Sequence, residues 1–126
     1  MGRLNLKNGS PEQRAGLKAE RLAILYLFLH GYRLLEHNYR IGHHEIDLIV
    51  RKGNNIAFVE VKSGYDRDGI SPIAKVDRRK RNNIIPASKY YIAKCGLDRV
   101  VFRYDVIVVD TKKLKIVHLE NAFYAS

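Results

Sequence analysis

Several residue types are scarce in this chain of 126 residues, and each scarcity excludes a class of protein. Cys95 is the single cysteine, so no disulfide can form within the chain, which suits a reducing cytoplasm. The longest apolar run, Leu22 to Leu29, is far too short to cross a bilayer, and the N-terminus lacks the apolar run of a signal peptide. We therefore expect a cytoplasmic protein that does not enter a membrane.

Acidic residues are also in short supply, because 13 Asp and Glu face 23 Lys and Arg, for a formal net charge of +10. Such a surplus fits a polyanionic partner, most simply a nucleic acid, and we expect DNA. A membrane surface or ribosomal RNA fits the same charge. Five of the cations lie within seven residues, and we predict that they contact phosphate: Lys75, Arg78, Arg79, Lys80 and Arg81. The alternative for this run is a solvated helix face.

The chain length predicts one domain over residues 1–126, with residues 1–9 as a flexible N-terminal segment. Ser10-Pro11 is a strong helix start, and Gly31 should end that helix after about His30. Its second half is apolar nearly all round, which predicts burial on more than one side. A second helix should start at Ser71 or at Asp77 and be kinked or split at Pro86.

Runs rich in β-branched and aromatic residues predict the strands. We expect them at residues 32–39, 45–51, 56–62, 99–110 and 114–119. The order is then helix, three strands, helix, two strands. This order predicts an α/β fold with a mixed sheet flanked by helices.

The second and third strands carry the most informative residues of the chain. A symmetric loop within Lys52–Asn55 pairs residues whose numbers sum to 107, so Asp47 should lie opposite Glu60 and Glu45 opposite Lys62. These four charged residues would then share one face of the hairpin. The other face would be wholly apolar and would form a core surface from Ile46, Leu48, Val50, Ala57, Val59 and Val61.

Two carboxylates directly across a ladder repel each other, and a divalent cation reverses the sign of that interaction. Asp47 and Glu60 therefore predict a Mg²⁺ or Mn²⁺ site, to which the carbonyl of Val61 would add a ligand. The metal would activate a water and polarise a phosphate, while Lys62 would either deprotonate the water or stabilise charge. The alternative is an ordinary half-solvated hairpin, in which Lys62 neutralises the carboxylates.

Other polar residues around this hairpin each have two interpretations. Glu20, which borders the apolar stripe of the first helix, either points toward the carboxylates or pairs with Lys18 or Arg21 at the surface. Glu45 either bridges Lys62 or belongs to an outer shell of the site. His44 lacks the spacing of a helical zinc pair, so a surface or outer-shell role is favoured, within reach of a phosphate if the turn allows.

Two further pairs of residues are not assigned to catalysis. Arg103 and Asp105 share one strand face and favour a structural ion pair. Tyr90 and Tyr91 lie beside lysines and would be able to stack on bases. Packing in the core is the commoner explanation for at least one of them.

Glu45-Ile-Asp47 followed by Phe58-Val-Glu60-Val-Lys62 resembles the PD-(D/E)XK nuclease signature. A longer ordered set is similar to the YraN family of uncharacterised bacterial proteins, which resemble archaeal Holliday-junction resolvases. That set covers about residues 12 to 120 and adds Ala19-Glu20, Gly31-Tyr32, Asn38-Tyr-Arg40, Lys80 and Arg103-Tyr-Asp105. The short motif alone has little specificity, whereas the ordered set is specific.

The resemblance implies a restriction-endonuclease-like fold with Asp47 and Glu60 as metal ligands and Lys62 as the catalytic lysine. It also implies that Glu20 assists from the first helix and that Lys80 contacts phosphate. The chain departs from the pattern at Ile46, where the named motif has proline, and at His44, where relatives tend to have glycine. These departures, with Ser63-Gly64 where many relatives have an arginine nearby, concern substrate handling and leave the carboxylate–lysine set intact.

Two hypotheses follow from the sequence. The first is a Mg²⁺-dependent endonuclease that hydrolyses phosphodiester bonds of DNA, with branched or recombination intermediates as its substrates by analogy. A junction-cutting enzyme needs two sites and therefore a homodimer. The second is a non-catalytic nucleic-acid-binding or assembly module that retains the nuclease fold.

Overall fold

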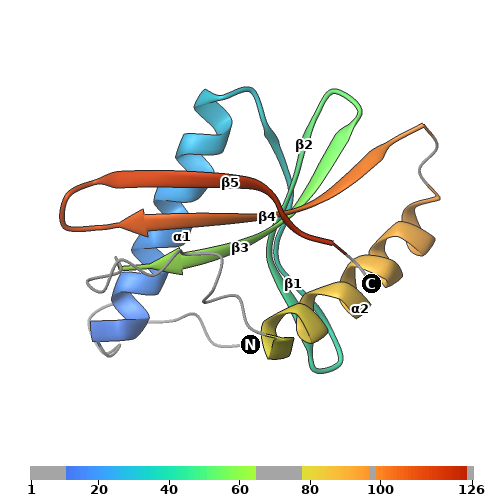
Figure 1. The fold of residues 1–126 in the computed structure, drawn as a ribbon, viewed down its shortest axis with the longest axis horizontal. Coiled ribbons are helices and arrows are strands. Elements are labelled where there is room, and N and C mark those ends of the chain that lie inside the picture. Colours follow the sequence, from blue (N-terminus) through green and yellow to red (C-terminus); the bar gives the residue numbers. More distant parts are fainter. Residues whose placement is uncertain (1–10, 65–77, 97–98, 125–126) are drawn as a thin grey trace.

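The computed structural model describes residues 11–64, 78–96 and 99–124, and the predicted N-terminal segment 1–9 lies outside them. Seven elements follow one another along this part of the chain, in the predicted order of helix, three strands, helix, two strands (Figure 1). They are α1 (Pro11–Leu29), β1 (Arg33–Ile41), β2 (His44–Lys52), β3 (Asn55–Ser63), α2 (Arg78–Cys95), β4 (Val101–Asp110) and β5 (Lys115–Phe123).

The described strands form one mixed sheet in the order β1-β2-β3-β4-β5. Neighbouring strands are antiparallel except β3 and β4, which run parallel because α2 lies in the connection between them. The predicted α/β class, with a mixed sheet flanked by helices, is therefore confirmed, and it is consistent with a restriction-endonuclease-like fold. Neither α1 nor α2, the helices of the described residues, is long and apolar enough to span a membrane.

Alternate residues of β3 enter two separate cores, because the helices cover opposite faces of the sheet. Ala57 and Val59 pack in the cluster that holds Ala23 and Leu27 of α1. Ile56 and Phe58 pack in the cluster that holds Ile84, Ala87 and Tyr91 of α2. The middle of the β2–β3 hairpin is thus buried on both faces. The alternative interpretation of the sequence, a hairpin with one face in solvent, is therefore wrong for this part.

Ile46 lies on a different side from the one predicted. It belongs to the α2-side core, whereas Leu48 and Val50 belong to the α1-side core. The change of side in β2 falls beside an irregular residue of β1, Asn38, which has a left-handed backbone with φ 53° between the pairs His37–Leu48 and Tyr39–Ile46.

The end of α1 is as predicted. Gly31 has φ 90°, and the backbone N–H of Tyr32 donates to the carbonyl of Leu27 at 2.9 Å. A C-terminal glycine in the left-handed region closes a helix in this way because it has no Cβ to clash.

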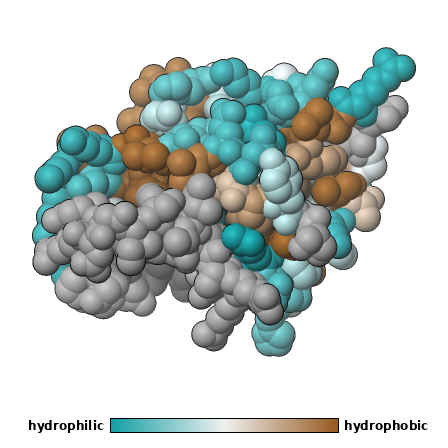
Figure 2. Space-filling view, in the orientation of Figure 1, coloured by the Kyte–Doolittle hydropathy of each residue, from teal (hydrophilic) through white to brown (hydrophobic). Residues whose placement is uncertain are grey.

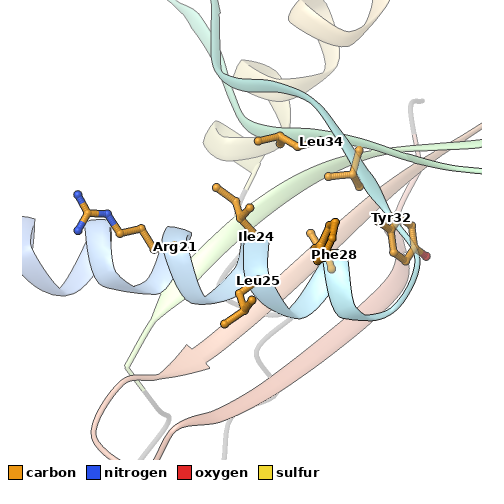
Figure 3. A pocket seen from close by; sticks show the side chains of 8 residues that line it. Arg21, Ile24, Leu25, Phe28, Tyr32 and Leu34 are labelled. Carbon is orange, nitrogen blue, oxygen red and sulfur yellow. The ribbon is translucent and has the colours of Figure 1, made fainter.

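Burial of α1 on more than one side is wrong. One stripe, formed by Ala19, Ala23 and Leu27, is buried against the sheet. Leu25, Phe28 and Leu29 are 53%, 69% and 71% exposed, because no described element covers the outer side of the helix. Figure 2 shows hydrophobic surface at the top of the view, where α1 ends in Figure 1. The same surface borders a cavity of about 260 Å³ between α1 and β1 (Figure 3).

The second helix is continuous through Pro86, so the predicted split is wrong. Pro86 is exposed, and buried residues on both sides of it, Ile84 and Ala87, hold the helix against the sheet. Tyr91 packs edge-on against Tyr39 with ring centroids 5.2 Å apart, which confirms a core role for one of the paired tyrosines. Both predicted helix starts, Ser71 and Asp77, lie outside the described residues.

Candidate active site

The predicted register of the β2–β3 hairpin is confirmed over the regular part of the ladder. Pairs run from Lys52–Asn55 at the turn to Leu48–Val59. Within the described strands the β2–β3 pairing ends there, one step before Asp47 and Glu60. Instead, a carboxylate oxygen of Asp47 accepts a hydrogen bond from the backbone N–H of Val61 at 2.8 Å. The Asp47 side chain therefore reaches across to β3 next to Glu60.

Pairing ends at Leu48 because β2 leaves β3 and follows β1. The β1–β2 pairs continue through Arg40–Glu45 to Ile41–His44, beyond the last β2–β3 pair. In Figure 1 the β1–β2 ribbon turns downward while β3 continues to the left. Asp47 thus lies at the point where the sheet divides. Because β2 has left β3 at this point, the backbone N–H of Val61 donates to the carboxylate of Asp47 and not to the backbone of β2.

Glu60 and Lys62 follow on β3. Strand alternation gives them the same side of β3 as Ile56 and Phe58, which is the α2 side. Glu60 is only 5% exposed, and its backbone lies beside that of Val106 in β4. Asp47 and Lys62 are half-buried. A carboxylate so far from solvent is costly unless a cation or hydrogen-bond donors compensate its charge.

The predicted opposition of Glu45 and Lys62 is wrong, because Glu45 lies in the part of β2 that has left β3. Its carboxylate pairs with the guanidinium of Arg40 in β1 at 3.0 Å. His44, half-buried, is the first residue of β2 and pairs with Ile41 beside the β1–β2 turn. Both residues therefore lie beside the β1–β2 turn, beyond the last β2–β3 pair.

Glu20 has a partner that the sequence did not single out. Its carboxylate lies 3.0 Å from the imidazole of His37 in β1. His37 pairs with Leu48, the neighbour of Asp47 in β2. The contact brings α1 to the strand position beside Asp47, and a supporting role for Glu20 in the site stays a prediction.

The basic segment is described in part. Lys75 lies outside the described residues, and Arg78, Arg79 and Lys80 form the first turn of α2. The guanidinium of Arg81 lies 5.5 Å from the ring centroid of Phe123, near the end of β5. Its Nε is buried and has no hydrogen-bond partner among the residues that the structure describes. Arg81 therefore packs against an aromatic ring, and contact of this segment with phosphate stays a prediction.

A buried network of polar side chains connects β4 with β5 and with Tyr32 before β1. The sequence predicted only the ion pair within it. Arg103 donates to both carboxylate oxygens of Asp105, at 3.2 and 2.9 Å, which confirms the structural ion pair. Asp105 is fully buried and is also 2.8 Å from the imidazole Nε2 of His118. The Arg103 guanidinium donates to the hydroxyl of Tyr32 at 2.7 Å. Tyr32, Arg103 and Asp105 belong to the ordered set of residues that resembles the YraN family, so the sequence carried a signal for this cluster. No sequence feature pointed to His118.

Burial raises the pKa of the Asp105 carboxyl, but hydrogen bonds from His118, Arg103 and the backbone N–H of Asn121 outweigh burial and hold the pKa below its usual value. Burial lowers the pKa of Arg103, and its bonds to Asp105 and Tyr32 more than offset this, so that pKa is raised. The pair is therefore fully charged at neutral pH. It joins β4 to β5 and to the start of β1.

The donor set at the divided end suits a hard cation. Within residues 11–64, 78–96 and 99–124, no three His, Cys, Asp or Glu side chains converge as a metal cage. Mg²⁺ commonly takes one or two carboxylates and completes its shell with water and substrate phosphate. Asp47 and Glu60, with the carbonyl of Val61, fit that smaller requirement.

The chain is similar to proteins of one family. The family model described as "Uncharacterised protein family UPF0102" matches residues 19–109. A UPF0102 protein of Chlorobium phaeobacteroides is 36% identical over 118 residues, covering 87% of this chain and 93% of that protein. One of Legionella pneumophila is 40% identical over 114 residues, covering 90% and 97%. One of Clostridioides difficile is 40% identical over 104 residues, covering 82% and 91%.

Proposed function

We propose that this chain, which belongs to the UPF0102 (YraN) family, is a metal-dependent endonuclease that hydrolyses phosphodiester bonds of DNA. One observation carries the proposal. Where β2 leaves β3, the carboxylate of Asp47 is tied to the backbone N–H of Val61, between Glu60 and Lys62 of the next strand. The carboxylates and the lysine of the motif are thereby gathered at one end of the sheet.

Asp47, Glu60 and the carbonyl of Val61 would hold Mg²⁺ or Mn²⁺ in this site. The bound cation would supply a more acidic water and neutralise charge on the phosphate. The hydrogen bond from Val61 fixes the orientation of the Asp47 carboxylate before substrate arrives. Lys62, on the same side of β3 as Glu60, would orient or deprotonate the attacking water, or stabilise charge on the phosphate.

The net charge of +10 supports a polyanionic substrate. Branched DNA enters the proposal through the resemblance to junction resolvases, and symmetric cutting of a junction requires a homodimer. The surface that we expect a second copy to cover is the outer side of α1. Its exposed Leu25, Phe28 and Leu29 form the kind of apolar patch that marks interaction sites on monomers.

The test is cleavage of end-labelled duplex, single-stranded, flap and four-way-junction DNA, with an RNA duplex beside them, in Mg²⁺, Mn²⁺ or EDTA. Wild type is compared with Asp47→Ala, Glu60→Ala and Lys62→Ala. Glu36→Ala, which removes an exposed carboxylate of β1, is the matched control. We expect metal-dependent cutting that falls at least about 100-fold in the three site variants and is unchanged in the control.

Binding without cutting, equal in wild type and all variants, would contradict the nuclease. That result would favour the non-catalytic nucleic-acid-binding module. Preferred cutting of RNA would change the substrate class and leave the site assignment standing.

A further inference from the structure

The turn end of the β2–β3 hairpin carries a second pair of like charges. Arg33 of β1 and Arg51 of β2 are direct partners in the antiparallel ladder. Like charges in this position destabilise a sheet. Lys52 follows immediately, and its ammonium lies 5.4 Å from the ring centroid of Tyr32. Three cations therefore gather where β1 begins and β2 ends.

Acidic side chains do not compensate this pair in the described part of the chain. Elsewhere in the sheet, Arg40 pairs with Glu45 and Arg103 with Asp105. Neither Arg33 nor Arg51 forms an ion pair with a described carboxylate. The Nε of Arg51 donates to the carbonyl of Gly53 at 2.9 Å, which orients its guanidinium without neutralising it.

The arginine pair also borders an open cavity. The cavity has a volume of about 490 Å³ and is lined by Gly31, Arg33, Arg51 and Gly53. The two glycines adopt φ values of 90° and 60°, a conformation that favours residues without a Cβ. Glycine also lets a ligand approach the backbone closely. The cavity thus combines two guanidinium groups with accessible main chain, a combination suited to a phosphate group.

We propose that this cavity, lined by Gly31, Arg33, Arg51 and Gly53, is a phosphate-binding site for a second stretch of nucleic acid. The identity of the ligand as nucleic acid rests on the proposed function. Arg51 and Asp47 are four residues apart in β2, which separates them by roughly 13 Å along the strand. Ile49 lies between them and is buried in the α2-side core. Because α2 covers that interval, the cavity and the carboxylate end engage separate stretches, such as two arms of a branched substrate.

The test compares a four-way junction with an 8-base-pair duplex, each labelled with a fluorophore. Binding is measured by anisotropy across a series of NaCl concentrations. Wild type is compared with Arg33→Gln/Arg51→Gln and with a matched control, Lys89→Gln/Lys94→Gln, which removes two exposed cations of α2. For the arginine variant we expect junction affinity to fall about tenfold and the slope of log K against log salt to lessen by about 1–2, as for the loss of one or two phosphate contacts. Binding of the short duplex should change less than about twofold.

Equal losses in the arginine and lysine variants would overturn the proposal, because they would indicate only a general charge effect. Equal losses on the short and branched substrates would overturn the separate second stretch. Failure of wild type to bind any nucleic acid would overturn the assignment of the ligand.

A second measurement does not depend on nuclease activity. Sodium tripolyphosphate should raise the Tm of wild type by at least about 2 °C more than that of Arg33→Gln/Arg51→Gln. A difference between the two proteins without any DNA cleavage would retain the anion site and reject the nuclease. DNA cleavage without a difference in Tm between the two proteins would retain the nuclease and reject the anion site. In the absence of anions, Arg33→Gln alone should raise the Tm by about 1–4 °C, because it relieves the repulsion with Arg51.

Discussion

The two ends of the β2–β3 hairpin differ in sign of charge and in backbone geometry. At the turn end the strands stay paired, and Arg51 faces Arg33 across the ladder. At the other end the strands part, and the side chain of Asp47 takes a hydrogen bond that the ladder no longer uses. Between the ends, residues such as Ile49 and Phe58 are fully buried. The hairpin therefore has an apolar interior, and its like-charged residues lie at its two ends, where we propose that ligands of opposite charge bind.

The largest expected change in stability concerns a third carboxylate, that of Asp105, which we compare with the carboxylate of Asp47. Asp105→Asn should lower the free energy of unfolding by about 3–5 kcal/mol, because the buried guanidinium of Arg103 then keeps only the exposed carboxylate of Glu120, 4.0 Å away, in place of its buried described partner. Asp47→Asn keeps an oxygen that can accept the bond from Val61, so it should cost less than about 1 kcal/mol. Urea denaturation measures both. Comparable losses would contradict the division into a structural and a functional carboxylate.

The next largest effect should be the stabilisation of the folded protein by a divalent metal, which we expect to depend on the carboxylate end of the hairpin and not on the arginine end. At a concentration 100 times its Kd, Mg²⁺ or Mn²⁺ should stabilise wild type by about 2.7 kcal/mol, because it binds the folded protein alone. Thermal unfolding should show the shift in wild type and in Arg33→Gln/Arg51→Gln, and no shift in Asp47→Ala. If saturating metal leaves the wild-type Tm unchanged, the carboxylate end is not a metal site.

Acid should weaken the middle of the sheet. The pKa of folded Asp105 lies below the ordinary 3.8, so its stabilisation is complete above that value and is lost as pH falls from 3.8 through the folded pKa. The difference in unfolding free energy between wild type and Asp105→Asn should therefore shrink below pH 3.8. Denaturation curves at pH 7, 5 and 3 measure it. A difference that stays constant over this range would mean that the ionised carboxylate is not what Arg103 and His118 stabilise.

The smallest expected change in stability concerns the exposed side of α1, away from both charged ends. Phe28→Lys should alter the free energy of unfolding by less than about 0.5 kcal/mol, because the side chain is 69% exposed in the single chain. If a second copy covers this surface, the same change should lower the mass measured by light scattering to that of a monomer. An unchanged mass would exclude this face as the dimer interface, and Arg14→Lys, a conservative change at an exposed position of the same helix, serves as the control.

Much of the fold follows from local signals along the chain. The glycine after α1 ends the helix, and the alternating runs give the strand order. A symmetric turn of polar residues determines which residues of β2 and β3 are partners, as the pairs from Lys52–Asn55 to Leu48–Val59 confirm. The Arg103–Asp105 pair follows from their spacing on one strand. The metal site and the nuclease activity, which the same residues predict, stay proposals.

Tertiary structure alone decided how the charged residues are partnered. Because β2 diverges from β3, Glu45 pairs with Arg40 and not with Lys62, and Ile46 lies in the α2-side core although Leu48 lies in the α1-side core. The opposition of Arg33 and Arg51 depends on the β1–β2 register, which shifts between Leu34 and Glu36. The physical reason is the same throughout. Spacing along a chain specifies which side chains share a face of a regular strand. Irregularities in strands, however, are stabilised by packing between segments that are distant in sequence. These irregularities determine which charged side chains become partners in ion pairs and hydrogen bonds.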